Sequence, residues 1–402
     1  MSSAPFAIFF AFCTVLQRSS VDGKEQPCPF DPMMKCVCAP DATLAYDFDR
    51  VTCNASTSPT FSPPAGMIYK TRMLQIISND VYKLDSFYFT KTFKIIDLLD
   101  LRLSEKVGTI EQEFDSHAFF GPTIAAVMFT GIGGLFPPPE ALKIMGRYGL
   151  KMLFISNHGT AKLDSNAFLN FSSLERLAIS DTKLTSIDNS AFSPLHNIKV
   201  LSLRSVGLLQ LPYESLRRIA YQLAALDFSK NNIWSIDVPW NEFSHLKSLN
   251  LSGNPLGPSI NSGAVSKLPA SLEMLLLAQI GLSKVPKNIL GFSNVLKKLD
   301  LRFNLITAMD SLDFVNLGSL TTLLLDGNNL LKVGSLPFSY LKSMTYISMK
   351  LTQLGSIDLA WFSGMGTSAV TQIILDGNAF LDEINFLSSS IVSYSTTLHC
   401  KS

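Results

Sequence analysis

The chain has 402 residues, of which 47% are hydrophobic and 16% are charged, and its formal net charge is +1. A balance this close to neutral provides no long-range field that would attract nucleic acid or an anionic membrane. The length alone would suggest two or three domains, but internal repeats allow a single array to grow without a domain break.

An apolar run opens the chain, from Ala4 to Leu16 (APFAIFFAFCTVL). It is shorter than the roughly 20 residues that a membrane-spanning helix needs, and it has the length of the hydrophobic part of a secretory signal. No Lys or Arg precedes it, which departs from the usual signal, whereas Val21 and Gly23 offer small residues for cleavage. We predict a signal peptide over residues 1–23 and a secreted protein with no stable membrane span. An uncleaved anchor is the alternative.

Four cysteines follow in residues 24–60, with the spacing C-x7-C-x-C-x14-C: Cys28, Cys36, Cys38 and Cys53. An even number of cysteines in a secreted chain predicts disulfide bonds. A segment this short has little core of its own, and disulfides compensate by restricting its unfolded state. A zinc site is the alternative because C-x-C occurs in such sites, but no histidine lies nearby to serve as a ligand. We therefore predict a disulfide-bonded N-terminal cap.

Residues 61–384 repeat one pattern, which is clearest in LTTLLLDGNNL from Leu320 to Leu330. The order L-x-x-L-x-L-x-x-N-x-L predicts a short strand followed by a turn in which Asn328 bonds the backbone. A single unit cannot bury its leucines, so units must stack. The pattern starts at thirteen positions, separated by 23 to 28 residues: 71, 96, 124, 150, 174, 198, 223, 246, 272, 296, 320, 344 and 370.

Two further columns support this register. An aliphatic residue recurs thirteen positions after most starts, and phenylalanine recurs eighteen positions after seven of them: Phe89, Phe114, Phe168, Phe192, Phe314, Phe338 and Phe362. The units that start at 71, 96 and 124 are the least regular. We expect looser or differently bonded turns where other residues replace the asparagine: His158, Thr182, Val206, Ile280 and Thr352.

The cysteine cluster and the repeats together resemble extracellular leucine-rich-repeat proteins with typical 24-residue repeats. The cap sequence, CPFDPMMKCVCAPDATLAYDFDRVTC, resembles secreted arthropod proteins similar to the non-catalytic leucine-rich subunit of a shrimp luciferase. The resemblance implies an α/β repeat solenoid, a horseshoe with a concave parallel β-sheet and an irregular or 3-10 convex side. It also implies disulfides Cys28–Cys38 and Cys36–Cys53.

The C-terminal tail, residues 385–402, departs from this family because it holds a single cysteine, Cys400, where many members have a second cysteine cap. The tail either covers the last repeat through apolar side chains, or the chain is a truncated form. The apolar residues are Phe386, Leu387, Ile391 and Val392. Cys400 is then unpaired or forms a disulfide dimer with a second chain.

No catalytic, cofactor or metal pattern is present, because the five histidines show no ligand spacing and no nucleophile or phosphate-loop motif occurs. We therefore predict that the chain is not an enzyme and has no cofactor. Three sequons predict glycosylation at Asn54, Asn170 and Asn250. Asn250 is expected at the centre of a strand on the concave face, where a glycan would obstruct the surface.

One column of that face carries charges of alternating sign in four successive repeats: Arg302, Asp326, Lys350 and Asp376. It is either an ion-pair ladder that aligns the strands, or a polar strip for protein binding beside Leu324 and Tyr346. The sequence thus predicts non-covalent recognition of an extracellular protein ligand by the concave surface, in adhesion, signalling or innate-immune binding. A non-catalytic subunit that stabilises a secreted enzyme is the alternative.

Overall fold

The computed structural model divides the chain into two compact units, Met1–Val200 and Leu201–Ser402, called here the N-terminal and C-terminal units. The structure describes residues 26–29, 36–41, 46–55, 68–78, 83–84, 92–104, 113–114, 122–134, 142, 145–165, 167–263, 267–290, 294–362, 364–365, 372–378 and 397–399. The predicted signal peptide and Cys400 lie outside these residues.

The N-terminal unit begins with a small antiparallel sheet held by two disulfides. Strands β1 (Gln26–Pro27), β2 (Cys36–Pro40) and β3 (Phe48–Ala55) pair in that order. The disulfides join Cys28 to Cys38 and Cys36 to Cys53, the pairing that the resemblance implied, and all four cysteines are buried. Strand β3 also pairs in parallel with β4, so the cap continues directly into the stacked strands.

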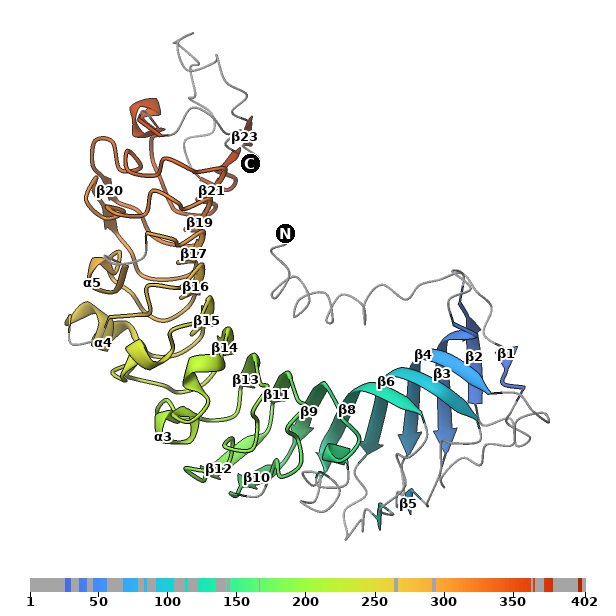
Figure 1. Cartoon of the computed structure of the whole chain (residues 1–402). Helices are drawn as coiled ribbons and strands as arrows, with labels where there is room; N and C mark the ends of the chain where they lie inside the picture. The colour runs from blue at the N-terminus through green and yellow to red at the C-terminus, as the bar shows by residue number, and fades with distance from the viewer. Residues whose placement is uncertain are drawn as a thin grey trace. The chain divides into compact units, whose positions relative to one another are not determined.

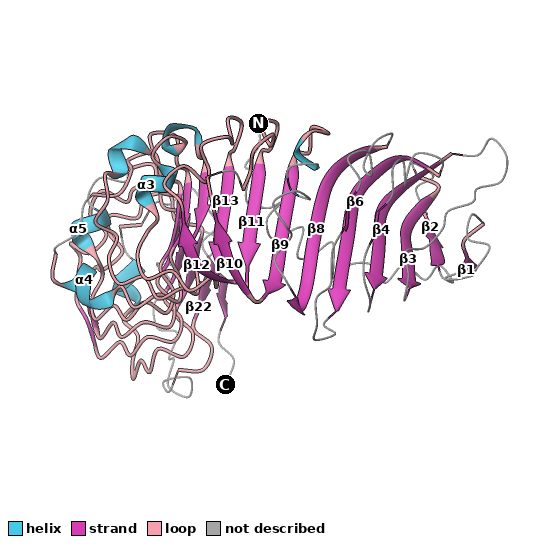
Figure 2. Ribbon diagram, turned by 90° about the horizontal axis from the view of Figure 1, so that it is seen from below, coloured by secondary structure: helices cyan, strands magenta, loops and turns pink. Residues whose placement is uncertain are grey.

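The main strands of the N-terminal unit are parallel and follow each other in chain order, as Figure 2 shows for β3 through β11. They are long at first and shorten along the chain: β4 (Tyr69–Ser78), β6 (Phe93–Ser104), β8 (Thr123–Gly134), β9 (Met152–His158) and β11 (Arg176–Ser180). A second row contains β5 (Lys83–Leu84), β7 (Glu113–Phe114), β10 (Thr160–Leu163) and β12 (Lys183–Ile187).

Register in this unit places equivalent residues of successive coils side by side in the core. One inward column contains Cys53, Ile76, Leu101, Phe129, Ile155 and Ile179. All six are at most 1% exposed. The turn position His158 is differently bonded, as expected, because it ends strand β9 and pairs with Gly134 of β8.

The main strands of the C-terminal unit are short, and Figure 1 shows them as small arrows stacked in chain order. They are β13 (Val200–Arg204), which begins at the unit boundary, β14 (Ala225–Asp227), β15 (Ser248–Asn250), β16 (Met274–Leu276), β17 (Lys298–Asp300), β19 (Thr322–Leu324), β21 (Tyr346–Ser348), β22 (Gln372–Ile374) and β23 (Thr397–His399). Each strand from β14 to β22 pairs in parallel with the next one in this order.

The side of the C-terminal unit away from these strands, called here the loop side, is irregular as predicted. Its second-row strands are β18 (Ala308–Met309) and β20 (Lys332–Val333). Its helices, drawn in cyan in Figure 2, have three to five residues each: α3 (Tyr213–Leu216), α4 (Gly257–Asn261), α5 (Lys287–Leu290) and the 3-10 helices η1 (Ala220–Gln222), η2 (Trp240–Glu242) and η3 (Leu359–Phe362). No helix in the described part of the chain is long and apolar enough to cross a membrane.

Phenylalanines stack under the loop side at the predicted spacing. In the N-terminal unit the rings of Phe168 and Phe192 are 5.8 Å apart between centroids. In the C-terminal unit the ring of Phe338 lies 6.1 Å from Phe314 and 5.6 Å from Phe362. The column prediction is therefore confirmed for these five residues. Phe89 lies outside the described residues, as does the side chain of Phe114.

The turn asparagines replace strand hydrogen bonds, as predicted, and also join neighbouring coils. Asn328 Nδ2 donates to Leu325 O at 2.7 Å and to Leu301 O of the preceding coil at 3.0 Å. Its Oδ1 accepts from the N–H of Ile306 at 3.2 Å. Where Val206, Ile280 and Thr352 stand in place of asparagine, their N–H groups donate to the asparagine of the next coil: Asn231, Asn304 and Asn378. Those turns are differently bonded, as expected.

The predicted solenoid of parallel strands is confirmed in both units, because equivalent strands lie side by side in sequence order. Of the predicted tail, the structure describes Thr397–His399, which forms β23 beside β22. The four apolar residues expected to cover the last repeat, Phe386, Leu387, Ile391 and Val392, lie outside the described residues.

Candidate functional site

The candidate binding surface is the open face of the C-terminal unit, defined here as the side of β17, β19, β21 and β22 that points away from the buried leucines. The inward residues Leu299, Leu323, Ile347 and Ile373 pair in one register. Alternation along each strand then places three columns on the open face. The first contains Lys298, Thr322, Tyr346 and Gln372, the second Asp300, Leu324, Ser348 and Ile374, and the third, just after the strands, Arg302, Asp326, Lys350 and Asp376.

Arg302 is fixed by Asp300 of its own coil rather than by the neighbouring coil. Its Nε donates to Asp300 Oδ1 at 2.9 Å and its Nη2 donates to Oδ2 at 2.7 Å. These hydrogen bonds raise the pKa of Arg302 above its ordinary value, although partial burial works in the opposite direction. The bidentate geometry holds the guanidinium in one orientation at the surface.

The other three members of the third column do connect adjacent coils. Asp326 accepts from the Ser348 hydroxyl and, at 2.8 Å, from the N–H of Lys350. Lys350 Nζ lies 3.0 Å from Asp376 Oδ2, and this hydrogen bond raises the pKa of Lys350. The interpretation as a continuous ion-pair ladder is therefore wrong for Arg302, and it holds for the pair of Lys350 and Asp376. The reason is that Asp300 offers Arg302 two carboxylate oxygens from the same strand.

The two apolar members of the predicted strip differ in their exposure. Tyr346 is half-buried and lies in the first column between Thr322 and Gln372. Leu324, in contrast, is only 9% exposed because it lies in the second column, between the first and third columns. Leu324 therefore presents little surface to a partner, and its role in binding stays a prediction. Tyr346 is only partly covered, so a partner can reach its ring.

The sequence reasoning did not pair Arg302 with Asp300, although a signal for this pairing exists. The triplet Asp-Leu-Arg occurs twice, at residues 100–102 and at residues 300–302. Residues two apart on a strand share a face, so an aspartate and an arginine at this spacing are placed to pair. Both triplets do so, since Arg102 Nε lies 2.9 Å from Asp100 Oδ2.

The three sequon asparagines differ in their surroundings. Asn54 in β3 and Asn170, which has a left-handed φ of 77°, are exposed. Asn250 is half-buried and is the last residue of β15, not its centre, and its Oδ1 accepts from the N–H of Ser252 at 3.1 Å. It points to the open face beside Asp227 and Leu276.

Within the described residues, no group of three or more His, Cys, Asp or Glu side chains is placed to hold a metal ion. The open face instead offers an arginine, a lysine and two aspartates in fixed positions around a tyrosine. Such an arrangement can hydrogen-bond and pack against another molecule.

The repeating units match two family models. Residues 149–208 match the model described as leucine rich repeat, and residues 245–268 match a second model with the same description. The coils within these two stretches therefore resemble leucine-rich repeats. The first match lies across strands β9 to β13, and the second begins just before β15.

Two curated proteins with leucine-rich repeats resemble parts of the chain. Leucine-rich repeats and immunoglobulin-like domains protein 1 of Homo sapiens is 28% identical over 180 residues, which is 43% of this chain and 16% of that protein. Toll-like receptor 10 of Bos taurus is 31% identical over 109 residues, which is 27% of this chain and 13% of that protein. The matched stretches thus span less than a fifth of either relative.

Solved structures share the leucine-rich-repeat fold at lower sequence identity. TLR13, from the crystal structure of a TLR13–ssRNA13 complex, superposes with a TM-score of 0.59 at 17% identity and covers 83% of this chain and 49% of that chain. The APL1 leucine-rich repeat domain superposes with a TM-score of 0.53 at 17% identity and covers 83% and 81% of the two chains. At such identity the comparison supports the fold alone.

Proposed function

We propose that the chain is an extracellular recognition protein that binds a protein partner non-covalently through the open face of its C-terminal unit. The observation that carries this proposal is the half-buried Tyr346 beside a column of fixed charges. Tyrosine and arginine are enriched among residues that dominate binding energy at interfaces. Arg302 is already oriented by Asp300, so its side chain would lose less conformational entropy when a partner binds.

The extracellular part of the proposal is supported by the two buried disulfides of the cap. Disulfides persist in oxidising compartments and are rare in the cytosol. The signal peptide predicted for residues 1–23 agrees with this location. We also propose that the exposed residues Asn54 and Asn170 carry N-linked glycans.

A protein partner is favoured over a nucleic acid by the charges of the open face. TLR13 was crystallised with single-stranded RNA. A nucleic-acid surface gains its affinity from lysines and arginines that neutralise phosphates. Here the positive Arg302 and Lys350 alternate with Asp326 and Asp376, and the net charge of the chain is only +1.

A glycan on Asn250 would restrict where a partner can bind. Asn250 lies on the open face two strands before β17, the first strand that carries the proposed surface. Binding would then be confined to the part of the face from β17 onward, around Tyr346. Peptide mapping by mass spectrometry that finds Asn250 unmodified removes this restriction.

The proposal is tested by affinity capture from native extracellular fluid, followed by mass spectrometry. The wild-type chain is compared with Tyr346→Ser and with the control Trp234→Ser, which changes an exposed aromatic outside the main strands. A partner that binds the open face should be recovered with the wild type and the control, and should fall about tenfold or more with Tyr346→Ser. Equal recovery with all three proteins contradicts the proposal.

The nature of the captured protein separates recognition from the accessory-subunit alternative. A stoichiometric enzyme partner recovered at constant ratio favours the non-catalytic subunit suggested by the shrimp resemblance. A cell-surface or microbial protein favours adhesion, signalling or innate-immune recognition. The charge column is tested separately with Asp326→Lys, for which unchanged capture with a lower melting temperature assigns the column to structure alone.

A further inference from the structure

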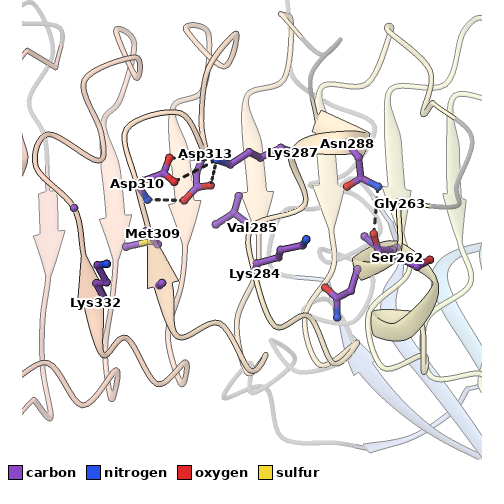
Figure 3. A pocket seen from close by; sticks show the side chains of 14 residues that line it. Ser262, Gly263, Lys284, Val285, Lys287, Asn288, Met309, Asp310, Asp313 and Lys332 are labelled. Atoms are coloured by element: carbon purple, nitrogen blue, oxygen red, sulfur yellow. Dashed lines mark hydrogen bonds and ion pairs between the residues drawn. The ribbon is translucent and has the colours of Figure 1, made fainter.

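The loop side of the C-terminal unit contains a groove of about 590 Å³, remote from the open-face columns of the same coils. Its floor is formed by the buried aliphatic residues Ile260, Val285 and Met309. This volume lies within the range of roughly 300–1,000 Å³ that small-molecule sites occupy. Figure 3 shows side chains from four successive coils around it, from Ser262 to Lys332.

Three lysines line the groove, but only one of them is neutralised. Lys287 Nζ lies 2.9 Å from Asp313 Oδ1 and 3.2 Å from Asp310 Oδ1, and the hydrogen bond to Asp313 raises its pKa. The dashed lines of Figure 3 mark this cluster at one side of the groove. Lys284 and Lys332 form no ion pair with any residue that the structure describes. Three lysines against two aspartates give the lining a net charge of +1, and the ammonium groups of Lys284 and Lys332 are exposed.

The repeat register explains how these two lysines are placed. Lys284, Ala308 and Lys332 occupy the same position, twelve residues after the start, in three successive coils. Ala308 in β18 is paired in register with Lys332 in β20. Ala308 and Lys332 lie in neighbouring strands about 4.8 Å apart, and Lys284 occupies the equivalent position one coil earlier, outside any strand. The methyl group of Ala308 lies between the two lysines, and a longer side chain at this position would fill the groove.

Two of the other lining residues also leave space. Gly334 and Gly263 contribute no side chain, and a Cβ on Gly263 would meet no atom within 4 Å. Polar groups are available at the end formed by α4, since Asn261 and Asn288 line the groove there. The groove thus combines an apolar floor, two unpaired ammonium groups and side-chain amides.

We propose that this groove binds a small ligand with two anionic groups, sulfate or phosphate, which Lys284 and Lys332 hold over Ala308. A sulfated oligosaccharide and a polyphosphorylated small molecule share this chemistry. The site is separate from the open-face columns, so it does not depend on the proposed function. Binding should weaken as the salt concentration rises, because both lysines are exposed.

Isothermal titration calorimetry with the full chain tests the proposal, with a heparin-derived sulfated tetrasaccharide, inositol hexakisphosphate and inorganic sulfate as probes. We expect the wild type to bind one of the first two probes at low salt, and inorganic sulfate more weakly. Each of Lys284→Ala and Lys332→Ala should weaken binding about tenfold, since hydrogen bonds to charged groups are of that strength. The probe that binds more tightly identifies the sulfate or the phosphate source.

Two variants separate a built site from general charge attraction. Lys298→Ala removes the same charge from the open face and should leave binding unchanged. Ala308→Phe retains both lysines but fills the space between them, and it should abolish binding. Melting temperatures verify that each variant is folded. The proposal is overturned if neither polyanion binds, if Lys298→Ala weakens binding as much as Lys284→Ala, or if folded Ala308→Phe binds normally.

Discussion

Strand β6 of the N-terminal unit has 12 residues, whereas the equivalent strand β19 of the C-terminal unit has three. The residue at the turn position does not explain this difference by itself, because β16 and β21 are also three residues long although Ile280 and Thr352 stand at their turn positions. In the coils of β6 and β8 that residue is Ser104 or Ile132, and it lies within the strand. In the coil of β19 it is Asn328, whose amide bonds the backbone instead.

The two units therefore satisfy the same backbone groups in different ways. In the N-terminal unit long parallel ladders pair the N–H and C=O groups, and two disulfides fix the first strands. In the C-terminal unit buried asparagine amides pair these N–H and C=O groups. The chain after each short strand then forms the turn that leads to the loop side. Buried backbone groups must be paired in either case, because each orphaned group costs free energy.

The largest effect is expected from removal of a turn asparagine. Asn328→Ala leaves two carbonyl groups and one N–H without their buried partner, which should lower the free energy of unfolding by about 3–5 kcal/mol. Asn329→Ala is the control, because the side-chain amide of Asn329 has a buried Oδ1 with no hydrogen-bond partner. Chemical denaturation measures both variants. Equal stability of the two would contradict the role given to the asparagine amide.

Loss of a disulfide should affect the N-terminal unit selectively. The Cys36→Ala, Cys53→Ala double variant opens the link between β2 and β3 and should cost about 2–4 kcal/mol. Hydrogen exchange should accelerate in β3 and β4, since repeats contact only their neighbours. Exchange in β19 and β21 should stay at the wild-type rate. If hydrogen exchange accelerates to the same extent in all four strands, loss of the disulfide does not affect the N-terminal unit selectively.

A glycine substitution tests how closely the coils approach at the turns of the C-terminal unit. Gly327 has a left-handed φ of 67°, and a Cβ on it would lie 2.4 Å from the Phe303 ring. Gly253 has a φ of 71°, but its nearest neighbour would lie 3.4 Å away. Both Gly→Ala changes strain the backbone by roughly 1–2 kcal/mol, and Gly327→Ala should cost about 1–3 kcal/mol more because the ring must move.

The role of the ring is isolated by a double variant. In the Phe303→Ala background, Gly327→Ala should cost no more than Gly253→Ala does in the wild type. A persistent excess cost in that background would mean that the ring is not responsible. Thermal unfolding of the four proteins provides the comparison.

The smallest effect concerns ion pairs between coils. Glu273 lies 2.7 Å from Lys297 and 3.1 Å from Lys247, and the hydrogen bonds from these lysines, Lys297 first, lower its pKa. Its side chain is about a third exposed, so solvent screening limits the contribution to about 0.5 kcal/mol. Glu175→Gln, the matched control in the N-terminal unit, removes a single ion pair with Lys151 and should cost less.

The pH dependence of this pair has a definite sign. The folded-state pKa of Glu273 is depressed below its ordinary value of 4.5, so its stabilisation is complete above about pH 4.5 and is lost as the pH falls through the folded-state pKa. The melting temperatures of wild type and Glu273→Gln should differ at pH 7 and converge at acidic pH. A difference in melting temperature that grows as the pH falls would contradict the direction given to the pKa shift of Glu273.

Much of this fold could be predicted from the sequence because each feature recurs at one spacing. The buried leucines, the phenylalanines such as Phe168 and the amide role of Asn328 all follow from the repeat. The strand lengths of the N-terminal unit were less accessible, because coils without the asparagine have long strands at β6 and β8 and three-residue strands at β16 and β21. The sequence marks the coils of β6 and β8 as irregular without indicating that their strands extend.

The candidate site was less predictable because it depends on choices among neighbouring side chains. Arg302 has acidic residues both in its own coil and in the next, and the spacing alone does not decide between Asp300 and Asp326. Leu324 alternates outward by its position, yet flanking columns bury it. The groove beside Ala308 required the coordinates, since its floor and its two lysines come from several coils.

Site-specific photocrosslinking tests the central claim most directly, namely that a partner binds the open face of the C-terminal unit. Benzoylphenylalanine at position 346 replaces one half-buried aromatic with another, and the same group at position 234 provides a control on an exposed tryptophan outside the main strands. After irradiation in native extracellular fluid, position 346 should yield a discrete crosslinked protein that position 234 does not. A crosslinked partner obtained from position 234 and not from position 346 would contradict the account.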